Sequence, residues 1–87
     1  MKDIKFLNAL LEIMNETNVS SFDVEFIEIR NRIEKLCFLS KKGTSLDFVT
    51  IYEVIEDLKL VLELLDGSNE SELQKFKRRF QELEKSQ

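Results

Sequence analysis

Only a few side chains in this sequence are of types that could do covalent chemistry, and the first of them is a lone cysteine. Cys37 stands between Leu36 and Phe38 in an apolar stretch, and the chain contains no histidine that could serve as its base. A cysteine nucleophile in an enzyme is activated by such a base or by another group that lowers its pKa. The sequence therefore favours a buried, unreactive thiol that packs like a small apolar side chain.

A group of carboxylates in the second half of the chain raises the question of a metal site. These residues are Glu53, Glu56, Asp57 and Glu63. Dimetal sites in helical bundles combine inward carboxylates with a Glu-x-x-His pattern, and histidine is absent here. We interpret the acids as a solvated helix side and predict no metal, no cofactor and, without a nucleophile–base pair, no enzyme activity.

A cluster of basic residues near the end of the chain has two interpretations. The cluster consists of Lys75, Lys77, Arg78 and Arg79. It could be a solvated face attracted to residues 45–66, which carry six acidic residues against a single lysine. It could also be a partner-recognition surface, because arginine is over-represented among the residues that dominate binding energy at protein interfaces. A phosphate-binding role is weaker, since glutamates flank the cluster on both sides.

The composition restricts the class of protein. The 87 residues include 13 basic and 17 acidic side chains, a formal charge of −4, two glycines and no proline. We expect one domain over residues 1–87, and the acidic balance argues against nucleic acid as the main partner. No apolar run approaches the ~18 residues of a membrane span, and the N-terminal stretch is not a convincing signal peptide. A cytoplasmic protein is therefore expected.

Apolar residues recur every three or four positions along most of the chain, which predicts helices. We place them at about 3–16, 22–42, 45–66 and 70–85. Gly43 and Gly67 follow the second and third helices, where a left-handed residue commonly ends a helix. Thr44-x-x-Asp47 has the spacing of a capping pair at the start of the third helix. Four helices with short connections predict an all-α, antiparallel up-down four-helix bundle.

The stretch 45–66 has two apolar lines, and we expect the other three helices to pack around it. The first line is Phe48, Ile51, Tyr52, Ile55, Leu58, Leu62 and Leu65, and the second is Leu46, Val49, Val54, Val61 and Leu64. Together they are broader than the apolar stripe of an ordinary surface helix. Phe6 and Phe38 lie off the main stripes of their helices and are candidates for a contact surface.

The second half of the chain resembles a known family. The residues that carry the likeness are Gly43, Thr44, Ser45, Asp66, Gly67, Ser68, Gln74, Lys75, Glu82 and Leu83. These residues lie in the elements that the family shares: a turn, a long helix with an Ile-x-x-x-Ile-type stripe, a second turn and a charged last helix. In these respects residues 34–85 resemble the C-terminal half of immunity proteins against pediocin-like (class IIa) bacteriocins, the enterocin A immunity family.

The resemblance implies a four-helix bundle in the cytosol of a Gram-positive bacterium. Such proteins protect the producer cell without destroying the toxin. They are thought to bind the membrane-embedded mannose phosphotransferase receptor once bacteriocin is bound to it, which implies a peripheral location at the inner face of the membrane. The family's specificity lies in the C-terminal half, here the hairpin of the third and fourth helices. A monomer or a weak dimer is expected.

The residues also permit a different kind of binding protein. A small helical adaptor, an antitoxin or a phage- or plasmid-borne inhibitor would act through protein–protein contacts. The breadth of the apolar stripe in 45–66 favours this alternative, because surface left uncovered by the other helices would attract a partner.

Overall fold

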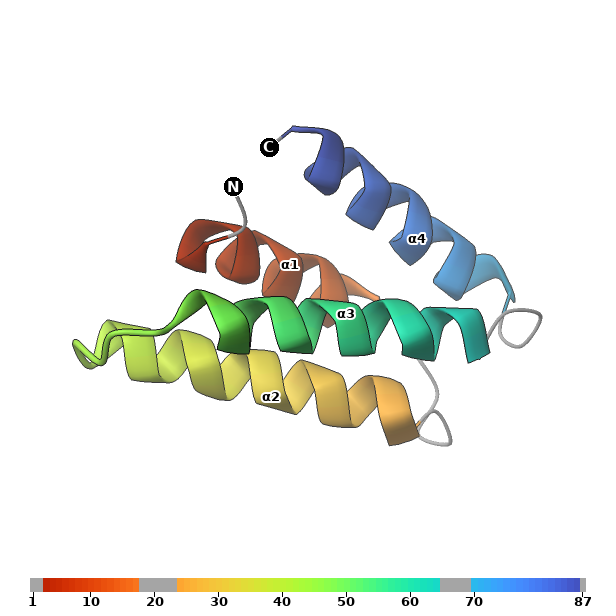
Figure 1. The fold of residues 1–87 in the computed structure, drawn as a ribbon. Coiled ribbons are helices and arrows are strands. Elements are labelled where there is room, and N and C mark those ends of the chain that lie inside the picture. Colours follow the sequence, from red (N-terminus) through yellow and green to blue (C-terminus); the bar gives the residue numbers. More distant parts are fainter. Residues whose placement is uncertain (1–2, 18–23, 65–69, 87) are drawn as a thin grey trace.

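The computed structural model describes residues 3–17, 24–64 and 70–86, and these form the predicted all-α, antiparallel up-down four-helix bundle (Figure 1). Its helices are α1 (Ile4–Glu16), α2 (Val24–Lys41), α3 (Phe48–Leu64) and α4 (Glu70–Lys85). The prediction matched α4 at both ends and α1 at its end. The predicted start of the second helix at Phe22 and the predicted end of the third at Asp66 lie outside the described residues, as does Gly67.

Two aspartates begin helices in the same way. The Oδ1 atom of Asp3 accepts hydrogen bonds from the backbone N–H groups of Lys5 and Phe6 at 3.0 and 3.2 Å. Asp47 Oδ1 accepts from the N–H groups of Val49 and Thr50 at 2.7 and 3.3 Å. Each carboxylate thus satisfies donors that have no partner within the helix. The predicted start of the third helix at residue 45 was therefore wrong, because Asp47 itself is the cap and α3 begins at Phe48.

The end of α2 confirms the role predicted for Gly43. Its φ angle is 91°, in the left-handed region that side-chain-bearing residues avoid. The Gly43 N–H donates to the Ser40 carbonyl and the Thr44 N–H donates to the Leu39 carbonyl, both at 3.0 Å. These two bonds are those of a Schellman motif, which turns the chain out of α2 and toward α3.

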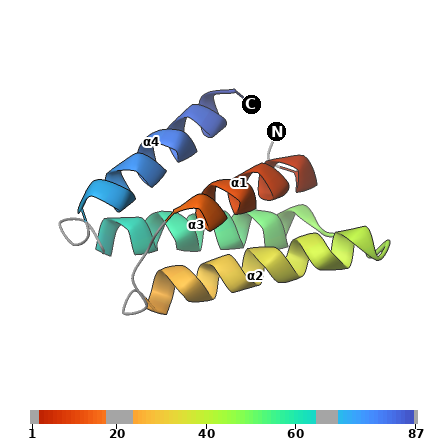
Figure 2. The same ribbon diagram turned by 180° about the vertical axis from the view of Figure 1, so that it is seen from behind.

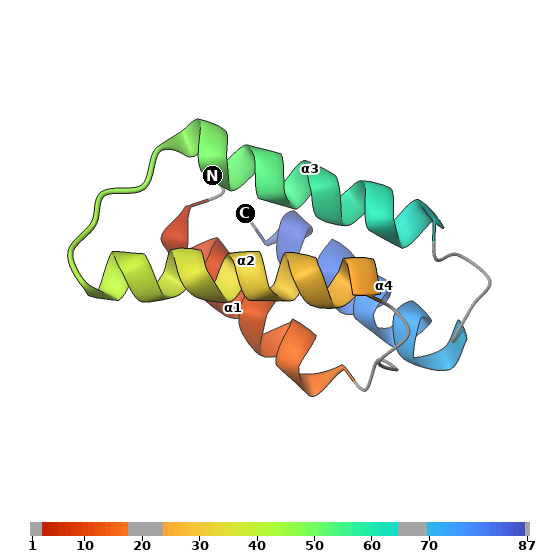
Figure 3. The ribbon, with the colours of Figure 1, turned by 90° about the horizontal axis from the view of Figure 1, so that it is seen from below.

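The helices are not arranged symmetrically around α3. The closest backbone approaches pair α1 with α2, α2 with α3, and α1 with α4. Figures 2 and 3 show α2 and α3 side by side, with α1 and α4 on the other side of the molecule. The prediction that three helices pack around residues 45–66 was therefore wrong in this respect, because α1 and α2 each have two close neighbours and α3 lies at one edge.

The core takes one stripe from each helix. Along α3 the buried residues are Ile51, Val54, Ile55, Leu58, Val61 and Leu62. Four residues of the two predicted apolar lines, Phe48, Val49, Tyr52 and Leu64, are instead exposed. Leu65 lies outside the described residues. The inner side of α3 is thus as apolar as predicted, but two residues of each predicted line are exposed.

Four phenylalanine rings join α4 to α1 and α2. Phe26 of α2 meets Phe76 edge-on with ring centroids 5.3 Å apart, and Phe76 stacks on Phe80 at 5.9 Å. Phe80 in turn meets Phe6 of α1 at 6.4 Å. Such geometries add favourable energy beyond the burial of apolar area. Phe6 is therefore a core residue, and its predicted place on a contact surface was wrong. Phe38 is 56% exposed.

We predict that Gly43→Ala lowers the free energy of unfolding by about 1 kcal/mol, because an L-residue in the left-handed region is strained. A Cβ atom at this position meets no atom within 4 Å, so the effect is one of backbone conformation and not of collision. Urea titration followed by circular dichroism measures the change. Gly43→Asn is the control, since asparagine tolerates this conformation better. Equal losses for both variants would contradict the explanation.

Candidate functional site

The four basic residues proposed from the sequence lie on α4 but do not form one patch. Lys75, Arg78 and Arg79 line a hollow between the end of α1 and the start of α4. Lys77 lines a separate groove between α3 and α4. Successive helix residues are ~100° apart, so Lys77 projects on the opposite side of α4 from Lys75 and Arg79. The structure therefore divides the predicted cluster between two surfaces.

The ion pairs of Lys75 and Arg79 are formed with residues outside 45–66, unlike the attraction expected for the cluster. Arg79 donates to the carboxylate of Glu16, which belongs to α1 and not to α3. Lys75 Nζ is 3.7 Å from Glu72 Oε1 on its own helix. Arg78 is exposed and forms no ion pair or hydrogen bond with the described residues. Arg78 is thus the cation of the group whose charge is the most available to a partner.

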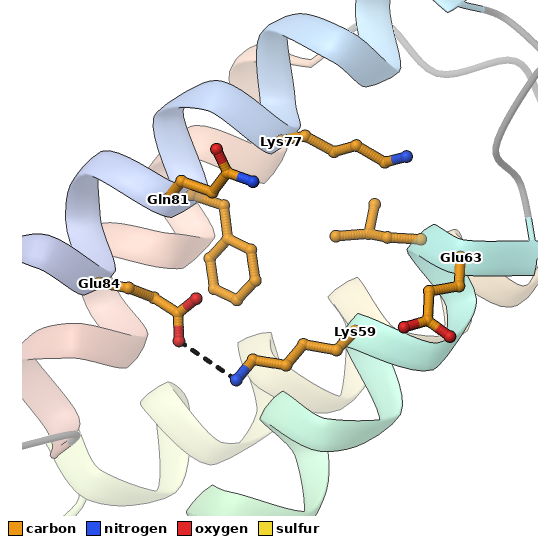
Figure 4. Close-up of a pocket in the computed structure, with 7 residues that line it drawn as sticks. Lys59, Glu63, Lys77, Gln81 and Glu84 are labelled. Carbon is orange, nitrogen blue, oxygen red and sulfur yellow. Dashed lines mark ion pairs between the residues drawn. The ribbon is translucent and has the colours of Figure 1, made fainter.

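The groove between α3 and α4 has an apolar floor and a charged rim (Figure 4). Its volume is about 320 Å³. The floor is formed by Leu62 and Phe80, which are buried core residues. The rim residues are Lys59, Glu63, Lys77, Gln81 and Glu84. The groove is open to solvent.

Electrostatic contacts across this groove are weak enough to rearrange. Lys59 Nζ lies 3.3 Å from Glu84 Oε2 of α4 and 3.6 Å from Glu56 Oε1 of α3. The sequence predicted that basic residues of α4 would pair with acidic residues of α3. In the Lys59–Glu84 pair the lysine belongs to α3 and the glutamate to α4. Partly exposed pairs of this kind contribute at most ~1 kcal/mol. An incoming charged group can therefore exchange partners with them at little cost.

Among the groove residues, only Lys77 was predicted from the sequence to contact a partner. Glu63 was interpreted as part of a solvated helix side, and Gln81 gave no signal. One available signal was Lys59, the single cation among the acids of its helix. In the structure this lysine pairs with Glu84 of the neighbouring α4.

Cys37 is positioned as the sequence predicted. The side chain is buried in α2 as part of the core. Burial raises the pKa of its thiol, an effect that Lys41 opposes and Glu34 reinforces. The thiol is therefore protonated at neutral pH, and a protonated, buried cysteine is a poor nucleophile. Among the described residues, no group of three or more histidine, cysteine, aspartate or glutamate side chains is placed to hold a metal ion.

Comparisons with protein-family models, curated proteins and solved structures found nothing that matches this chain. Within residues 3–17, 24–64 and 70–86, none of the helices combines the length and the apolar character needed to cross a membrane.

We predict that Cys37 makes stability fall at alkaline pH. A thiol whose pKa is raised by folding stabilises the native state fully below the pKa of the unfolded thiol, ~8.5. That contribution is lost as the pH rises through the pKa of the folded thiol. The free energy of unfolding of the natural protein should therefore decrease more between about pH 8 and 10 than that of Cys37→Ala.

Urea titrations of both proteins across this range test the prediction, because other alkaline groups are common to both. The thiol of the folded protein should also react with a disulfide reagent far more slowly than that of the unfolded protein. Parallel pH profiles, or rapid labelling of the folded protein at neutral pH, would contradict the assignment.

Proposed function

We propose that this protein is an immunity protein that protects a cell against pediocin-like bacteriocins by binding a protein partner, not by catalysis. The observation that carries the proposal is the groove between α3 and α4. Residues 34–85, which carry the resemblance to that family, supply both helices that form it. The four-helix fold is also the fold that the resemblance implies.

The groove explains how such binding would work. Leu62 and Phe80 line its floor, and removal of apolar surface from water drives most protein–protein association. The rim carries both signs of charge, which favours specificity and correct orientation over raw affinity. We infer that the ligand is a segment of the mannose phosphotransferase receptor in its bacteriocin-bound state, reached from the cytoplasmic side of the membrane.

Expression of the protein in a bacteriocin-sensitive strain tests this function. We predict that the inhibitory concentration of at least one peptide from a pediocin-like panel rises. Lys77→Glu should abolish that protection, because it reverses the charge of a groove-lining residue. Lys5→Glu is the matched control, since it makes the same charge reversal at a residue exposed on α1 outside both surfaces of α4. Unchanged sensitivity to the whole panel would remove the support for an immunity function.

Arg78→Ala tests the second surface of α4 in the same assay. The effect of this variant is easier to interpret than that of Arg79→Ala, because removal of Arg79 also leaves Glu16 without its ion-pair partner. We predict reduced protection with normal thermal unfolding. Unaltered protection by a folded Arg78→Ala protein would exclude this residue from the recognition surface and leave Lys77 and the groove as the candidate site.

A second function, a helical adaptor, antitoxin or inhibitor, is favoured by a specific observation. Seven large apolar residues among those described are exposed, and five of them belong to α3: Phe48, Val49, Tyr52, Leu60 and Leu64. If this surface mediates self-association, the sedimentation coefficient should rise over the micromolar range for the natural protein and not for Leu64→Ser. A strictly monomeric species would count against self-association through α3.

A further inference from the structure

The side of α3 that points away from the core has a regular pattern of its own. We call it the outer face and define it by Val49, Glu53, Glu56, Leu60, Glu63 and Leu64, all of which are exposed. The first five step by four, three, four and three residues, so they share one side of the helix. Val49, Leu60 and Leu64 are 63%, 58% and 80% exposed. The face therefore combines apolar side chains with carboxylates.

No described helix covers the outer face (Figure 3). On one flank of α3, Asp57 accepts a hydrogen bond of 2.7 Å from Arg32 of α2. On the other flank, Lys59 pairs with Glu84 of α4. The outer face lies between these two flanks, opposite the stripe that is buried in the core. Contacts to α2 and α4 thus leave it free along the length of α3.

The charge on the outer face is largely uncompensated. Glu53 and Glu63 form no ion pair with the described residues, and the nearest cation to Glu56 is Lys59 at 3.6 Å. A partner that covers Leu60 and Leu64 must also approach these carboxylates. A neutral or acidic partner would remove water from these carboxylates without forming ion pairs with them, which is unfavourable. A partner with lysine or arginine beside its own apolar stripe would form those ion pairs.

A second copy of this chain that presents its own outer face or α4 does not fit the requirement. Two outer faces brought together would oppose like charges. The cations of α4 do not provide a match, because the apolar residues of that helix, Leu73, Phe76 and Phe80, are already buried in the core. The occupant must offer both an apolar stripe and positive charge on one surface.

We propose that the outer face of α3 is a docking site for a cationic amphipathic helix of another protein. With 17 residues, α3 is ~25 Å long and has nearly five turns, about 3.6 residues in each. Leu60 and Leu64 anchor the apolar stripe, and Glu53, Glu56 and Glu63 pair with flanking lysines or arginines. Glu63 also lines the groove between α3 and α4, but Val49, Glu53, Glu56, Leu60 and Leu64 lie outside it, so the proposal does not depend on the proposed immunity function.

A pair of synthetic peptides tests the proposal by fluorescence anisotropy with the purified full-length chain. Both have leucines at helical three- and four-residue spacing; one carries flanking lysines and the other carries glutamates at the same positions. We expect the lysine peptide to bind, the glutamate peptide to bind far more weakly, and added salt to weaken the lysine peptide's binding. Failure of the lysine peptide to bind, or equal binding of both peptides, would overturn the proposal.

Matched variants locate the binding site. The double variant Glu53→Gln/Glu56→Gln, which changes two exposed residues outside the groove, should weaken binding of the lysine peptide by about fivefold or more. The control Glu12→Gln/Glu28→Gln removes the same charge from exposed positions on α1 and α2 and should leave binding unchanged. Equal effects of the two double variants would show that only net charge matters and would overturn the assignment.

The apolar contribution has its own control. Leu60→Ser/Leu64→Ser should abolish binding, whereas Val24→Ser/Phe38→Ser, which changes two exposed apolar residues of α2, should not. Because all four side chains are exposed, the variants should unfold at similar urea concentrations. If the natural protein forms a dimer that Leu60→Ser/Leu64→Ser abolishes, the occupant of this face is a second copy and the proposal is wrong.

Discussion

The contact between four phenylalanine rings determines the position of α4 relative to α1 and α2. Most of α4 is charged, and its apolar residues form one narrow line. Phe76 and Phe80 on that line reach Phe26 of α2 and Phe6 of α1. Because this aromatic contact draws α4 toward α1, the helix diverges from α3 (Figure 1). The gap that results is closed at its base by Leu62 and Phe80 and remains open above them as a groove.

The position of α3 at one edge of the bundle leaves one side of this helix exposed. A helix with neighbours all round would bury most of its apolar residues, whereas α3 buries one stripe and exposes five large apolar side chains. Its carboxylates are similarly divided, since Asp57 pairs with Arg32 while Glu53 and Glu63 have no such partner among the described residues. The same helix therefore contributes to the core on one side and presents a mixed acidic and apolar surface on the other.

The sequence was sufficient for the fold because helical periodicity and glycine placement are local signals. It did not identify the residue that caps the start of α3, because the side chains of both Thr44 and Asp47 can cap a helix. It also failed where the answer depended on a neighbour. Periodicity shows that Val49 and Val54 are apolar but not which of the two another helix covers. The division of Lys77 from Arg79 follows from helix geometry, yet the groove itself depends on the inclination of α4, which local patterns do not encode. Whether these residues recognise a partner remains a prediction.

The pairing of α4 with α1 also bears on how the protein forms in the cell. On the ribosome, α1 emerges before α4, so the ring of Phe6 has no aromatic cover until the last helix has been synthesised. The first three helices can associate as they appear, since each is adjacent in space to the one before it. Completion of the core nevertheless waits for the C-terminal segment. A nascent or prematurely terminated chain therefore exposes aromatic surface of the kind that chaperones and proteases bind.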